Sequence, residues 1–189
     1  LKRAFVITSV NIEELKLQLA PVPFRFREKP EGPRSWAEEN ILPDTFRLEK
    51  GSIDSLSVSY GEAGRPYVLD GTRVESAYDA GSSQYRFEMQ GGRLRLPFKG
   101  CPEFSLMSGT AQFNHASRRV NVPSCRLTTA AGGYLDIKGD WDGSSSSWTA
   151  NMVVNGVPAS SVLEDHWKKH VQGSVSGGID LRGGRDGVT

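Results

Sequence analysis

The sequence predicts an all-β fold, mainly antiparallel, with one short embedded helix. Apolar and polar residues alternate in roughly ten or more short segments, which follow one another about every ten residues. The 21 glycines are scattered along the 189 residues without a collagen-like period, as expected of a chain with many turns. One segment alone has the features of a helix.

Residues 1–43 are expected to form N-terminal strands and a proline-rich connection. The run 5–7 predicts one strand, and Leu15, Leu17 and Leu19, which alternate with polar residues, predict another. Asn11 is a good helix cap, so a short helix from this residue is the alternative. Prolines 21, 23, 30, 33 and 43 would interrupt a strand ladder, which favours a connecting segment after residue 20.

Residues 44–182 are expected to form the main β domain, followed by a flexible end at 183–189. Gly91–Gly92, residues 114–116 and residues 144–147 are predicted turns. The strands predicted by alternation are 46–48, 53–60, 67–69, 72–78, 85–89, 94–98, 104–106, 111–113, 120–122, 125–127, 135–137, 152–154 and 175–181.

The helix is predicted over residues 158–169. Pro158 suits a first turn, and the basic residues 168–170 come late, where they complement the helix dipole. Val162, Leu163 and Trp167 would form its apolar side.

Charge and hydropathy exclude several classes of function. The 23 basic and 22 acidic residues are interspersed, which argues against a nucleic-acid partner. No apolar run approaches the roughly 20 residues needed to cross a bilayer, and no signal peptide opens the chain. The first residue is leucine, so we expect the chain to be a piece of a longer protein.

No residue pattern predicts an enzyme, a metal site or a cofactor. His166 and His170 are four residues apart, but Trp167 stands where a zinc protease needs its glutamate. Asp140 and Asp142 lack the other ligands of a calcium loop, so residues 139–143 are interpreted as a tight turn. Residues 173–177 resemble a nucleophile elbow only loosely, with Val175 in the central place.

Two further features leave alternatives open. Trp141 and Trp148 either pack on a core face or form a sugar-stacking platform. Cys101 and Cys125 either form a disulfide, if the compartment is oxidising, or remain half-buried thiols.

The order and spacing of several phrases resemble the AsmA-like family of bacterial envelope proteins, relatives of TamB within the repeating-β-groove group. The resemblance covers residues 42–182. It rests on three segments: 42–53 (LPDTFRLEKGSI), 132–141 (GGYLDIKGDW), and 155–159 (NGVPA) followed by 173–181 (GSVSGGIDL).

This resemblance implies a strongly curved sheet whose concave apolar face is a groove for phospholipid acyl chains crossing the periplasm. It also implies that the longer protein is anchored in the inner membrane, continues the sheet, supports outer-membrane homeostasis and works with membrane-embedded envelope proteins. The candidate groove residues are Leu94, Leu96, Val120, Val122, Leu135, Ile137, Met152 and Val154.

Two other interpretations compete with lipid transport. A β-sandwich binding or adhesion module, for glycans among other ligands, would have a closed core. Such a module would also carry Trp141 or Trp148 together with the two aspartates on one exposed edge. A purely structural scaffold is the third interpretation.

Overall fold

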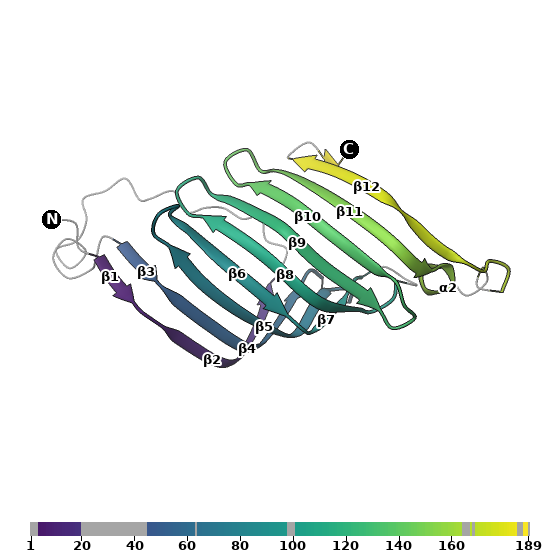
Figure 1. The fold of residues 1–189 in the computed structure, drawn as a ribbon, viewed down its shortest axis with the longest axis horizontal. Helices are drawn as coiled ribbons and strands as arrows, with labels where there is room; N and C mark the ends of the chain where they lie inside the picture. Colours follow the sequence, from purple (N-terminus) through teal and green to yellow (C-terminus); the bar gives the residue numbers. More distant parts are fainter. Residues whose placement is uncertain are drawn as a thin grey trace.

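The computed structural model describes residues 4–19, 45–62, 64–97, 101–163, 167, 169–184 and 187–188. Within them, one large curved sheet of eleven strands dominates (Figure 1). A separate two-stranded sheet pairs β1 with β3. The strands are β1 (Ala4–Ile7), β2 (Val10–Leu19), β3 (Thr45–Leu48), β4 (Lys50–Tyr60), β5 (Tyr67–Asp79), β6 (Gln84–Gln90), β7 (Arg93–Arg95), β8 (Phe104–Asn114), β9 (Arg119–Thr129), β10 (Tyr134–Asp142), β11 (Ser147–Pro158), β12 (Ser174–Gly184) and β13 (Gly187–Val188).

The prediction of a mainly antiparallel all-β fold is confirmed. From β4 to β13 every neighbouring pair is antiparallel, because short connections return the chain beside itself. The two parallel pairs are β2 with β4 and β1 with β3. β2 therefore belongs to the same sheet as β4–β13, whereas β1 and β3 do not.

Several segments predicted as two short strands are single long strands. β5 joins 67–69 to 72–78, β8 joins 104–106 to 111–113, and β9 joins 120–122 to 125–127. Each contains a register irregularity, and the one in β8 leaves Met107 as an extra residue, 56% exposed. Such a β-bulge reverses the alternation of faces, so one strand looks like two in the sequence.

Three hairpins end in four-residue turns of one design, at 80–83, 115–118 and 143–146. Asp79, Asn114 or Asp142 precedes each turn, and its side-chain oxygen accepts hydrogen bonds from backbone N–H groups within the turn. The turn predicted at residues 139–143 is wrong in position, because β10 continues through Asp140 to Asp142.

Gly91 and Gly92, predicted as a turn, interrupt a strand instead. β6 and β7 lie on either side of them, and both pair with β5 and β8. Gly92 has φ +93°, and a Cβ there would collide with Oγ1 of Thr72, a fully buried residue. Glycine thus allows the segment from β6 to β7 to change direction inside the sheet. In the same region β4, β5 and β7 bend behind β8 and β9 (Figure 1).

The helix is shorter than predicted. It begins after Pro158, as expected, but α2 covers only Ala159–Val162, and Leu163 is already extended. Residues 164–166 and 168 lie outside the described part of the chain, and with them the predicted His166. Trp167, beyond the break at Leu163, is helical and 52% exposed.

Candidate functional site

The strand registers align many apolar side chains of the large sheet on one face. One register row crosses nine strands, from β2 to β12, through eight successive pairs, and contains only apolar residues and one glycine. We call it the central row: Ile12, Ile53, Val74, Met89, Gly109, Cys125, Ile137, Met152 and Ile179. The side of the sheet that carries it is the apolar face.

Neighbouring rows extend this face toward both ends of the strands. Toward the hairpin turns, Phe113, Val120, Trp141 and Trp148 oppose one another in succession. Toward α2, the corresponding row consists of Leu106, Leu127, Leu135 and Val154. The apolar face is therefore at least three rows deep across β8–β11.

Only part of the apolar face is covered. Five residues form a buried cluster near α2, with Leu69, Leu94 and Leu96 packed against it: Phe104, Leu106, Leu127, Leu135 and Val157. Toward the two edges the same face is open, with Leu17 40% exposed on β2 and Ile179 45% exposed on β12. At the hairpin end β3 reaches this face, where the backbone N–H of Leu48 donates to the hydroxyl of Tyr85 and Arg47 lies over the ring of Tyr78. Among the described residues this two-stranded sheet is the only other one, so the face is not the closed core of a sandwich of two large sheets.

The eight predicted groove residues all belong to this face or its cluster. Val120, Val122, Ile137, Met152 and Val154 are half-buried on β9, β10 and β11. Leu94 opposes Leu69 and Phe104, and Leu96 follows β7 and packs against the cluster. Leu135 is 8% exposed and is part of the buried cluster itself.

The prediction omitted the part of the face formed by β2, β4 and β6. Tyr85, Phe87 and Met89 oppose Tyr78, Ser76 and Val74, and therefore continue the apolar face. Their alternation with Arg86 and Glu88 was visible in the sequence. It does not reveal which strands become neighbours, however, and so does not assign them to the same surface.

The two tryptophans lie on the opposite side of the sheet from the two aspartates. Trp141 directly opposes Trp148, whereas Asp140 opposes Thr149 and Asp142 opposes Ser147. A Cβ at Gly183 would lie 2.5 Å from Cε2 of Trp148, so this ring rests on the neighbouring strand. All four residues nevertheless line one open hollow near the hairpin turns, so the glycan-binding alternative stays a prediction.

The polar face is held together by cross-strand pairs. Arg126 forms a bidentate ion pair with Asp136, which lowers the pKa of this carboxyl group. Asp142 accepts hydrogen bonds from the hydroxyl and backbone N–H of Ser144 and from Arg119, and these bonds lower its pKa to about 2. The carboxylates of Asp136 and Asp142 are thus both hydrogen-bonded to neighbouring residues of the sheet and its turns.

An open hollow of about 490 Å³ lies near the hairpin turns. It is lined by polar residues from several strands and also by both aspartates and both tryptophans: Gln112, Asn121, Thr149, Asp140, Asp142, Trp141 and Trp148. In the described part of the chain, no group of three or more histidine, cysteine, aspartate or glutamate residues could hold a metal ion. His115 lies exposed in a hairpin turn with its ring edge-on to Phe113.

Both cysteines are free, half-buried thiols in the structure, so the disulfide alternative is not formed here. Cys125 belongs to the central row and Cys101 packs against the buried cluster. Burial raises the pKa of both thiols.

Comparison of the chain with models of protein families, with curated proteins and with solved structures finds no match. Over the residues that the structure describes, no helix has the length and hydropathy to cross a membrane.

Proposed function

We propose that this chain is a non-enzymatic module of a bacterial envelope protein whose apolar face binds phospholipid acyl chains on the periplasmic side. The central row is the observation that carries the proposal. An apolar stripe that crosses nine strands without a polar side chain, half-buried at Ile12 and 45% exposed at Ile179, needs a ligand, a partner or a further layer to cover it.

The size of the row suits an acyl chain. Nine strands separated by about 4.8 Å span roughly 38 Å along the sheet, against about 15 Å for the hydrocarbon part of one leaflet. Each methylene group removed from water contributes about 0.8 kcal/mol, so ten would contribute about 8 kcal/mol before the cost of ordering the lipid. More than one acyl chain could therefore lie along the face.

The edge of the sheet supports a place within a longer protein. In the described chain, β13 pairs only with Gly183 and Gly184 of β12, and residues 174–182 have no strand on their outer side. An unpaired edge of this length favours a further strand, which we propose the longer, inner-membrane-anchored chain supplies. Membrane-embedded envelope proteins are the second partner that we propose.

The test is mass spectrometry of organic extracts from the purified protein. The informative variant is Ile137→Asn with Met152→Asn, which places two amides side by side on the central row. The control is Val153→Asn, the adjacent residue, which is 42% exposed on the polar face. Circular dichroism and urea unfolding would establish that all three proteins are folded.

We expect phospholipid to co-purify with the wild type and the control, and to be lost from the double variant. Lipid that stays bound to a folded double variant would place the lipid elsewhere. If no protein of the series carries lipid or takes it up from mixed micelles, the proposal is wrong.

A further inference from the structure

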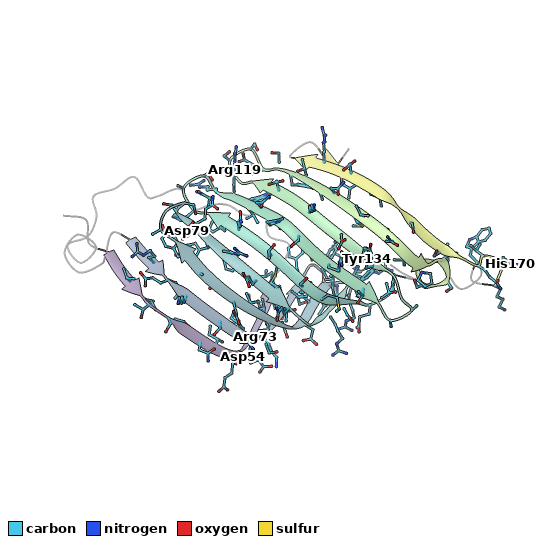
Figure 2. All side chains as sticks on the ribbon, viewed as in Figure 1. Asp54, Arg73, Asp79, Arg119, Tyr134 and His170 are labelled. Carbon is cyan, nitrogen blue, oxygen red and sulfur yellow. The ribbon has the colours of Figure 1, made fainter. Side chains whose placement is uncertain are left out.

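The turn between α2 and β12 projects from the body of the protein. Figure 2 shows His170 at the extreme end of the molecule, beyond the strands. The backbone N–H groups of His170 and Val171 donate to the carbonyl oxygen of Trp167 at 2.9 and 3.0 Å. These two bonds close a turn, which we call the tip, formed by Trp167, Lys169, His170 and Val171.

The tip exposes large apolar side chains. Trp167 is 52% exposed and Val171 is 37% exposed, whereas Leu163, which follows α2, is half-buried. Lys169 and His170 are exposed between them. A tryptophan beside a cation is the combination that settles at membrane interfaces, because the ring enters the headgroup region while the cation stays near the phosphates.

Net charge does not dominate this segment. Glu164 and Asp165 balance Lys168 and Lys169 in the sequence 164–170, so with neutral histidines the segment has no net charge. Attraction to a bilayer would therefore come mainly from burial of Trp167 and Val171, and would depend only weakly on anionic lipid.

The tip is followed in the chain by β12, which carries part of the apolar face. Val175 and Ile179 follow it along β12, 44% and 45% exposed, and oppose Val157 and Met152 on the apolar face. Four exposed apolar residues, Trp167, Val171, Val175 and Ile179, thus follow one another at intervals of four along the chain, and the last belongs to the central row. Val175 and Ile179 are not members of the buried cluster, whose residues lie on β8–β11.

We propose that the tip docks on the surface of a phospholipid bilayer and that lipid enters the apolar face along β12. The docking step rests on the tip alone. The entry step rests also on the proposed lipid-binding function.

Docking is tested by co-sedimentation with vesicles of phosphatidylcholine, and of phosphatidylcholine mixed with phosphatidylglycerol. Trp167→Ser should weaken binding about tenfold or more, because half of the indole surface can enter the interface. Trp167→Tyr, which keeps an amphipathic ring, should restore most of the binding. Val153→Ser removes an exposed apolar side chain from the polar face and should bind as the wild type does.

The remaining outcomes separate docking from lipid binding. A double variant Ile137→Asn, Met152→Asn that still binds vesicles through Trp167 would support docking even if the apolar face holds no lipid. Binding that is absent in the wild type, unchanged by Trp167→Ser, or lost in the double variant would overturn the docking site. If Trp167→Ser abolishes docking but lipid transfer between vesicles continues at the wild-type rate, entry along β12 is wrong.

Discussion

Two adjacent glycines allow the backbone packing beside the buried cluster to be tested with a matched pair of variants. Gly132 and Gly133 connect β9 to β10 with φ +99° and +78°. A Cβ at Gly133 would lie 2.6 Å from the carbonyl carbon and oxygen of Gly156 and from Cα of Val157. A Cβ at Gly132 would have no heavy atom within 4 Å. Both substitutions by alanine impose backbone strain, but only one forces backbone atoms apart.

We expect Gly132→Ala to lower the free energy of unfolding by about 1–2 kcal/mol, the cost of a side chain at positive φ. Gly133→Ala should lower the free energy of unfolding by about 1–3 kcal/mol more than Gly132→Ala does. The backbone atoms that the new Cβ would meet cannot rotate away as a flexible side chain can. Since φ at Gly132 lies further from the left-handed minimum, the control does not understate the strain. Urea unfolding followed by circular dichroism measures both values, and equal destabilisation would refute the close approach of Gly133 to Gly156.

Three further predictions follow from the two faces. Leu127→Ala should cost about 2–5 kcal/mol in urea unfolding and Val153→Ala less than about 0.5, since their side chains are 3% and 42% exposed; similar costs would contradict the assignment of faces. Because the pKa of Asp142 falls from 3.8 to about 2 on folding, its stabilisation is present above 3.8 and is lost as pH falls toward 2. Acid titration of unfolding should therefore be shallower for Asp142→Asn, and identical curves would contradict its bonds to Ser144 and Arg119. In a Cys101→Ser background, Cys125 should react slowly with a thiol reagent because burial raises its pKa, and bound lipid should slow it further. An equal rate with and without lipid would place the lipid away from the central row.

Strand existence was predictable from the sequence because alternation survives within each half of a strand. In β8 the residues on the apolar face are Phe104 and Leu106, then Gly109, Ala111 and Phe113. The change from even to odd numbers marks the extra residue at Met107. β9 shows the same change between Val122 and Cys125, on either side of Pro123, which has no N–H for a ladder. Alternation in the sequence shows which residues share a face. It does not show whether a change from even to odd positions is a bulge within one strand or a break between two, because that depends on the register with a neighbouring strand.

Pairing and burial were harder to predict. The parallel pairing of β2 with β4 depends on the connection 20–44, and no local pattern in Leu15 to Leu19 selects this partner. Leu127 and Val120 alternate equally well in the sequence, yet only Leu127 is buried, because the cluster forms beside α2. In contrast, the separation of Trp141 from Asp140 was available from their adjacency alone, since neighbouring residues in a strand point to opposite faces.

The two faces of the sheet stabilise it in different ways, which explains how a sheet with few buried residues can keep part of its apolar surface exposed. Backbone ladders, capped hairpin turns and pairs such as Arg126–Asp136 fix the strands from the polar side. The buried cluster then needs to secure only the end of the sheet near α2. Exposed ion pairs contribute little individually, at most about 1 kcal/mol each. Because part of the apolar surface also stays exposed to water, we expect the isolated sheet to have only marginal stability. A ligand that covers the central row would supply the missing burial and stabilise the folded state, which ties the proposed lipid binding to the fold itself.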